Sequence, residues 1–128
     1  MKIRIYYEDT DCGNVVYYAN YLKYMERGRT EYLRERGIEL DTYHRRGVLF
    51  AVAEVNVKYR RPARYNDLID METTLTDTSS ITFVFETSFY NQKGELLANG
   101  TAKMVCIDAG TNRACKIPKE LAERIQAG

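Results

Sequence analysis

Residues 6–33 read YYEDTDCGNVVYYANYLKYMERGRTEYL and place an acidic turn directly before a segment whose apolar side chains return at helical spacing. The turn is Asp9-Thr10-Asp11-Cys12-Gly13. A helix start carries unpaired backbone N–H groups and a partial positive charge, which stabilise an oxygen atom that gains negative charge. We therefore expect the chemistry at this junction, with a carboxylate just upstream as base or nucleophile.

The segment from about residue 20 to residue 36 is predicted to be the one long helix. Its apolar positions are Tyr21, Leu22, Met25, Tyr32 and Leu33. Gly37 suits a left-handed C-terminal cap. Gly28 lies inside the helix, where glycine costs about 1 kcal/mol relative to alanine. It predicts a close approach of this helix to another backbone, as when a helix lies on a sheet.

The rest of the chain reads mainly as strands. Residues 2–8 alternate between apolar and polar side chains, and four further alternating segments cover about 49–60, 67–76, 80–90 and 95–107. Turn residues separate them, which predicts an antiparallel meander. Pro118 fits the first turn of a short terminal helix that carries Leu121, Ala122 and Ile125 on one face. The sequence therefore predicts one α+β domain over residues 1–128, with a helix packed on a curved antiparallel sheet.

Charge and cysteine content exclude several classes of protein. The chain has 19 basic and 18 acidic side chains, so no global field attracts nucleic acid or an anionic membrane. No apolar run resembles a signal peptide or a membrane span, and we expect a cytoplasmic protein without an integral membrane segment. Cys12, Cys106 and Cys115 lack metal-ligand spacing. We expect reduced thiols and no metal.

Three segments carry a resemblance to a known family: YYEDTDCGNVVYY at 6–18, YLKYMERGRTEYL at 21–33 and YRRPARYND at 59–67. The chain resembles the 4-hydroxybenzoyl-CoA thioesterase family of hotdog-fold enzymes, particularly the acyl-CoA thioesterase branch associated with bacterial Tol-Pal systems. The resemblance implies a hotdog fold, an acyl-CoA substrate or an acyl carrier protein donor, no cofactor, and a homodimer or homotetramer. Unpaired sheet edges favour such pairing.

The resemblance also implies catalytic roles for two residues. Asp11 takes the position of the catalytic carboxylate, as nucleophile or general base, and the backbone N–H of Tyr18 polarises the thioester carbonyl. Asp9 is then a turn residue. From spacing alone, both aspartates fit Asx-turn and capping hydrogen bonds equally well. Some members of the Tol-Pal branch carry histidine at the position of Tyr18, so the acyl group stays open.

Substrate contacts are predicted at two further places. Gly13 is expected to let the chain turn sharply and approach the substrate, although an ordinary tight turn explains a glycine equally well. Residues 14–17, which include Val16 and Tyr17, are expected to line the entrance of the acyl pocket, although buried aromatic side chains more often belong to a core. Arg61, Arg64 and Ser80 are candidates for binding coenzyme A by resemblance. A solvated basic strand edge and an ordinary serine turn explain these three residues equally well.

Other chemistries fit the sequence less well. Cys12 could act as a nucleophile, but the one histidine, His44, is not placed near it by any pattern. A serine triad lacks its Gly-x-Ser-x-Gly motif. A cation site at Glu8, Asp9 and Asp11 is a poor fit, because further oxygen ligands are not placed nearby by the spacing. By resemblance, a hotdog dehydratase uses a histidine paired with an acid, which this pattern fits badly. The remaining alternative is a hotdog protein that binds acyl-CoA or acyl carrier protein without turnover.

Overall fold

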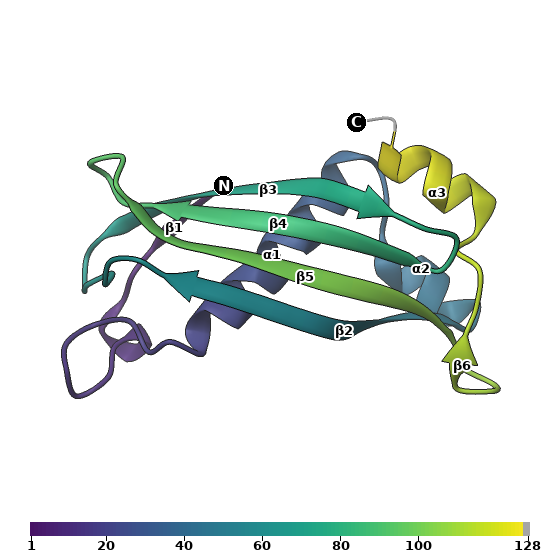
Figure 1. The fold of residues 1–128 in the computed structure, drawn as a ribbon, viewed down its shortest axis with the longest axis horizontal. Helices are drawn as coiled ribbons and strands as arrows, with labels where there is room; N and C mark the ends of the chain where they lie inside the picture. Colours follow the sequence, from purple (N-terminus) through teal and green to yellow (C-terminus); the bar gives the residue numbers. More distant parts are fainter. Residues whose placement is uncertain (127–128) are drawn as a thin grey trace.

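A computed structural model describes residues 1–126 as one curved antiparallel sheet with helices packed on one face (Figure 1). The strands are β1 (Lys2–Arg4), β2 (Val48–Tyr59), β3 (Leu68–Thr78), β4 (Thr82–Tyr90), β5 (Leu96–Asp108) and β6 (Arg113–Ala114). The helices are η1 (Tyr7–Asp9, a 3-10 turn), α1 (Asn20–Glu35), α2 (Leu40–Arg45) and α3 (Lys119–Gln126). This is the α+β arrangement that the sequence predicts.

The sheet has the strand order β1-β3-β4-β5-β2, and β6 extends it beside β5. The predicted four-stranded meander is confirmed for β3, β4 and β5 and is wrong for β2. Strand β2 does not pair with β3 but lies at the edge next to β5, from Val48 opposite Asp108 to Tyr59 opposite Ala98. Because β2 is long and has a partner on only one side, its outer edge presents unpaired backbone groups.

Helix α1 lies across the sheet and touches β3 at Gly28. A Cβ atom placed on Gly28 would lie 2.5 Å from Oγ1 of Thr73 and 3.2 Å from Cε of Met71. The predicted close approach is confirmed, although the nearest atom belongs to the Thr73 side chain and not to backbone. Gly37, with φ of 73°, follows the helix as its predicted left-handed cap.

Two groups of buried side chains form the core. One group packs the first half of α1 on the sheet and includes Tyr21, Met25 and Phe89. The other joins the end of α1 to β4, β5 and α3 and includes Leu33 and Leu121. Alternate residues of β4 from Phe83 to Phe89 are buried, which confirms the period of two that identified this strand.

The structure corrects three expectations. Strand β1 ends at Arg4, and η1 turns Tyr7 outward so that its side chain is 75% exposed. Leu22 lies on α1 but is 42% exposed and not on the buried face. Helix α2 and strand β6 were not predicted, because six and two residues are too short to reveal a period.

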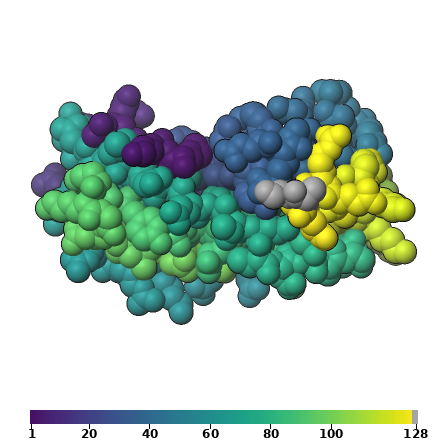
Figure 2. Space-filling view, turned by 90° about the horizontal axis from the view of Figure 1, so that it is seen from above, coloured from purple at the N-terminus to yellow at the C-terminus, as the bar shows by residue number. Residues whose placement is uncertain are grey.

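Helix α3 closes one end of the molecule, where it lies against the segment that follows α1 (Figure 2). The Arg124 guanidinium donates to the Gly37 carbonyl at 3.0 Å, and the Arg46 guanidinium donates to the Glu120 carboxylate at 3.0 Å. These contacts anchor the end of the described chain. Among residues 1–126, no helix is both long enough and apolar enough to cross a membrane.

Candidate active site at the start of helix α1

The acidic turn forms a small hairpin before α1. The Asp11 amide donates to the Val15 carbonyl at 2.9 Å, and the Asn14 amide donates to the Asp11 carbonyl at 3.0 Å. Asn14 has φ of 64°, so asparagine and not Gly13 occupies the left-handed position of the turn. The Val16 amide then donates to the Ala63 carbonyl at 2.8 Å and fixes the hairpin to the sheet end.

Asp11 projects into solvent from this hairpin. Its Oδ1 atom accepts the Gly13 N–H at 2.8 Å, which makes an Asx turn. A Cβ atom on Gly13 would lie 3.2 Å from the same oxygen, closer than almost all real contacts. The role of Gly13 is therefore to leave room beside the carboxylate, and not to adopt a positive φ. Within residues 1–126, the Oδ2 atom of Asp11 accepts no hydrogen bond.

Asp9 has a structural role, as expected. Its Oδ2 atom accepts the Tyr6 N–H at 2.8 Å across η1. Its backbone carbonyl accepts the Tyr17 N–H at 3.0 Å and the Asn20 side-chain amide at 2.9 Å. These bonds hold the hairpin directly against the first residues of the helix.

The helix start supplies free donors. In the described chain, the N–H groups of Tyr18 and Ala19 have no hydrogen-bond acceptor, whereas the Tyr17 and Asn20 amides on either side are bonded. Unpaired N–H groups at a helix N-terminus favour a developing negative charge. The Tyr18 carbonyl accepts the Tyr59 hydroxyl at 2.9 Å, so the edge strand β2 supports this peptide segment.

Tyrosines surround the helix start. The ring of Tyr18 lies 4.9 Å from that of Tyr17 and 6.4 Å from that of Tyr59, between ring centroids. Burial raises the pKa of Tyr21 to about 12, with the neighbouring Tyr59 adding to the effect. The Tyr21 phenol is therefore neutral at neutral pH.

Val16 and Tyr17 differ in their exposure to solvent. The Val16 side chain is only 5% exposed and belongs to the core, whereas Tyr17 is exposed at 43%. Of these two predicted pocket residues, only Tyr17 is therefore accessible.

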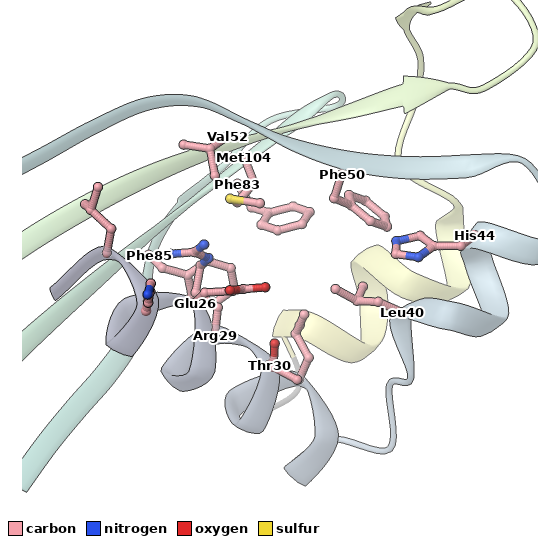
Figure 3. Close-up of a pocket in the computed structure, with 13 residues that line it drawn as sticks. Glu26, Arg29, Thr30, Leu40, His44, Phe50, Val52, Phe83, Phe85 and Met104 are labelled. Atoms are coloured by element: carbon pink, nitrogen blue, oxygen red, sulfur yellow. The ribbon is translucent and has the colours of Figure 1, made fainter. Parts of the chain in front are cut away.

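A cavity of about 400 Å³ lies between α1, α2 and the concave face of the sheet (Figure 3). Phe50, Phe83, Phe85 and Met104 reach into it from β2, β4 and β5. One end reaches Leu22 and Lys23, in the first turn of α1. Sequence reasoning missed this cavity, although the inward positions of the alternating strands are the signal that identifies its sheet residues.

Charged groups lie on the helical side of this cavity, where Glu26 and Arg29 project from α1 and His44 from α2 (Figure 3). Burial lowers the pKa of Arg29, and Glu26 acts in the opposite direction. His44 lies on α2, whereas Cys12 lies in the hairpin before α1 (Figure 1). The structure of one chain therefore does not support a catalytic pair of Cys12 and His44.

Arg61 and Arg64 follow β2, next to the acidic hairpin. Arg61 forms an ion pair with Glu95 at 3.4 Å. Arg64 pairs with Val15 as an isolated bridge, which brings its backbone beside the hairpin, and its amide donates to Asp67 at 2.8 Å. A depression of about 270 Å³ is lined by both arginines and Lys93, and also by the carboxylates of Asp67 and Glu95.

Ser80 lies at the other end of the sheet, in the turn between β3 and β4 (Figure 1). The 11 residues of β3 span about 35 Å. Ser80 and the two arginines therefore do not meet within one chain. The Ser80 carbonyl accepts the Ile117 N–H at 2.8 Å, so this turn also supports the segment before α3. No group of three or more His, Cys, Asp or Glu side chains is arranged for a metal ion anywhere in residues 1–126.

Comparisons with known proteins give a consistent result. A model of the thioesterase-like superfamily matches residues 6–125. The chain is 36% identical over 120 residues to the acyl-CoA thioesterase YbgC of Haemophilus influenzae, covering 93% of this chain and 88% of the relative. It is 34% identical over 119 residues to the acyl-CoA thioester hydrolase YbgC of Escherichia coli O6:H1, covering 93% and 89%. A crystal structure of the hypothetical protein TT1821 from Thermus thermophilus superimposes with a TM-score of 0.92 at 29% identity, covering 99% of this chain and 96% of that one.

Proposed function

The chain belongs to the thioesterase-like superfamily and has the hotdog fold, and from that premise we propose that it hydrolyses the thioester of an acyl-CoA to a free acid and coenzyme A. Two relatives that share about a third of its residues over most of the chain are named for this reaction. The proposed reaction needs no metal or organic cofactor.

One observation carries the proposal: the exposed Asp11 carboxylate and the unpaired N–H groups of Tyr18 and Ala19 belong to the same short junction. Main-chain hydrogen bonds between Asp9 and Tyr17 hold the hairpin and the helix start together. A carboxylate and preorganised N–H donors are the two components that acyl transfer requires.

In the proposed mechanism, the thioester carbonyl oxygen accepts a hydrogen bond from the Tyr18 N–H. Asp11 either takes a proton from an attacking water or attacks the carbonyl carbon itself. The intermediate then expels the coenzyme A thiolate, whose conjugate acid has a pKa of about 8.5 if it resembles free cysteine. When water attacks, this step leaves the free acid; when Asp11 attacks, it leaves an anhydride between the acyl group and Asp11, which water then hydrolyses to the free acid. A thiolate of this kind departs without a protein acid, and this explains how a site without a nearby histidine can operate.

The acyl group is proposed to occupy the cavity between α1 and the sheet. Its sheet side is lined by aromatic and aliphatic side chains, and its lining reaches Leu22 and Lys23 in the first turn of α1, the helix whose start carries the proposed oxyanion donor. Gly13 and Tyr17 are proposed to border the thioester. Val16 is proposed to act from the core by holding the hairpin.

The coenzyme A moiety is proposed to approach along the strand end that carries Arg61 and Arg64. Arg64 is the stronger candidate for a phosphate contact, because the Arg61 guanidinium is engaged with Glu95. Ser80 lies too far away to contact the same molecule within one chain. Its proposed nucleotide contact therefore requires a second copy of the chain.

We further propose that the protein is a homodimer or a dimer of dimers in the cytoplasm, where acyl-CoA is available. An acyl group on acyl carrier protein is a second possible donor, since the arginines suit either anionic partner. The link to Tol-Pal systems that the resemblance implies remains a prediction.

A protein that binds acyl-CoA without turnover is the second candidate. The Asx turn favours this second candidate. The Oδ1 atom of Asp11 already accepts the Gly13 N–H, which is a structural role that needs no catalysis. The two candidates differ in one property, which is the release of thiol from bound substrate.

The test measures thiol release from acetyl-, hexanoyl-, palmitoyl- and 4-hydroxybenzoyl-CoA by wild type and Asp11→Asn. Glu8→Gln is the matched control, because it neutralises another exposed carboxylate close to the same turn. We expect Asp11→Asn to lower turnover at least ~100-fold while the fold persists, since the charge is lost and the volume is kept. Glu8→Gln is expected to match wild type.

The other outcomes are distinct. Equal turnover by wild type and Asp11→Asn would refute the role of Asp11 and keep the reaction. Binding of the panel without any thiol release by wild type would refute hydrolysis and support the binding protein.

A further inference from the structure

Cys106 and Cys115 face each other across the junction of β5 and β6. Ile107 pairs with Ala114, so the same register brings Cys106 opposite Cys115. The Cys115 amide donates to the Cys106 carbonyl at 2.9 Å, and the two Sγ atoms lie 3.3 Å apart. This separation is roughly 1 Å longer than a disulfide bond of ~2.05 Å.

The two thiols differ in accessibility. Cys106 is completely buried in the core group beneath α3, whereas Cys115 is only partly buried at its border. Burial, reinforced by the hydrogen bond to Cys115, raises the pKa of the Cys106 thiol to about 12. An oxidant in solution therefore reaches Cys115 first, because Cys106 is both shielded and rarely ionised.

We propose that Cys106 and Cys115 form a reversible thiol–disulfide site that fastens the segment leading into α3 to strand β5. The oxidant is a low-molecular-weight disulfide such as glutathione disulfide. The Cys115 thiolate attacks it, forms a mixed disulfide and releases one glutathione thiolate. The Cys106 thiol then attacks the Cys115 sulfur, and its proton passes to the departing second glutathione thiolate. Two protein thiols and one glutathione disulfide thus give one protein disulfide and two glutathione molecules.

The position of the pair gives the bond a structural consequence. Cys115 is followed by Ile117, whose amide donates to the Ser80 carbonyl at 2.8 Å, and then by α3. A bond between the two sulfurs adds a covalent tie beside this hydrogen bond. Because the pair is already in contact in the folded chain and apart in the unfolded chain, folding and disulfide formation favour each other.

The experiment uses the full chain carrying Cys12→Ser, which removes the exposed third thiol. The protein is equilibrated in glutathione buffers of graded ratio, quenched with iodoacetamide and digested with trypsin. Cleavage after Lys103, Arg113 and Lys116 places the two cysteines on separate peptides, residues 104–113 and 114–116. A disulfide joins these two peptides, and the mass of the joined pair identifies the bond. The same titration in denaturant gives the unfolded reference, and Cys115→Ser is the control.

We expect the native protein to form the linked peptide with an equilibrium constant at least ~10-fold above that of the unfolded chain. By linkage, the oxidised protein should unfold at a higher temperature than the reduced one, and dithiothreitol should reverse the change. Cys115→Ser should show neither effect. A native constant equal to or below the unfolded one, or two separate glutathione adducts without a link, would overturn the proposal. Because no readout involves hydrolysis, failure of the proposed enzyme activity would not affect this result.

Discussion

At the scale of single residues, the proposed role of the hairpin depends on the space beside the Asp11 carboxylate. Gly13 leaves this space, since a Cβ atom there would lie 3.2 Å from Asp11 Oδ1. The chain repeats the same geometry at Asp108-Ala109-Gly110. The Gly110 amide donates to Asp108 Oδ1 at 2.8 Å, and a Cβ on Gly110 would also lie 3.2 Å from that oxygen.

This repetition supplies a matched control for a first prediction. Gly13→Ala should lower turnover about 10-fold by displacing Asp11, a cost of about 1.4 kcal/mol in the transition state. Gly110→Ala imposes the same local crowding in the turn between β5 and β6, so it should leave turnover unchanged. Steady-state rates of both variants, with unfolding temperatures as a check on the fold, make the comparison. Equal rates for the two variants would contradict the role given to Gly13.

The same repetition explains the limit of sequence reasoning at this scale. An aspartate followed by glycine two positions later gives an Asx turn at both sites, so the motif alone does not distinguish a candidate active site from an ordinary turn. The distinguishing feature at Asp11 is the helix start that follows. The sequence predicts unpaired amides at this helix start. That those of Tyr18 and Ala19 have no acceptor among residues 1–126, whereas those of Tyr17 and Asn20 do, is a property of backbone geometry that a side-chain pattern does not resolve.

At the scale of elements, the contact between α1 and β3 depends on Gly28 and Thr73. Gly28→Ala gains about 1 kcal/mol of helix propensity, yet its Cβ would lie 2.5 Å from Thr73 Oγ1. We expect a net loss of about 1–3 kcal/mol in the free energy of unfolding, because overpacking outweighs propensity.

The double variant Gly28→Ala with Thr73→Ala removes the clashing oxygen and should recover part of this loss. Urea unfolding of the wild type, both single variants and the double variant gives the coupling free energy. Additive effects of the two substitutions would show that the contact does not limit the approach of the helix.

Elements with a clear period were predictable from the sequence, and short or irregular ones were not. Helix α1 begins at Asn20 as expected, and the four long strands begin and end within a few residues of their predicted limits. The strand predicted over residues 2–8 is wrong beyond Arg4, where β1 ends. The alternation of apolar and polar residues continues to Tyr7 in the sequence, but in the structure Tyr7 begins a 3-10 turn. The alternation of β2, β4 and β5 marks the sheet residues of the cavity, but the cavity also depends on how α2 packs against β2, and this tertiary packing leaves no local signal.

At the scale of the whole molecule, β2 is an edge with apolar side chains exposed. Val52 is 49% exposed and Val55 is 41% exposed, and among residues 1–126 no further strand lies beyond β2. Exposed apolar side chains and an unpaired edge are expected for a strand that is covered by a second copy of the chain.

We expect Val55→Asp to weaken self-association at least ~10-fold, because one charge per copy would be brought into an apolar contact. Thr42→Asp, an exposed substitution on α2 with the same added charge, is the control. Sedimentation equilibrium over a range of concentrations measures both. A dimer of undiminished affinity in Val55→Asp would move the expected interface away from this edge.

The hairpin has a consequence for how such a protein can diversify. Its shape is held by main-chain hydrogen bonds, from Asp11 to Val15, from Val16 to Ala63 and from Tyr17 to Asp9. Side chains at Cys12 and Asn14 are exposed and contribute nothing to that backbone ladder. Random substitutions at these two positions can therefore accumulate while Asp11 keeps its place, provided that position 14 tolerates a left-handed backbone. A descendant could change the surface around the proposed site one exchange at a time without rebuilding the hairpin.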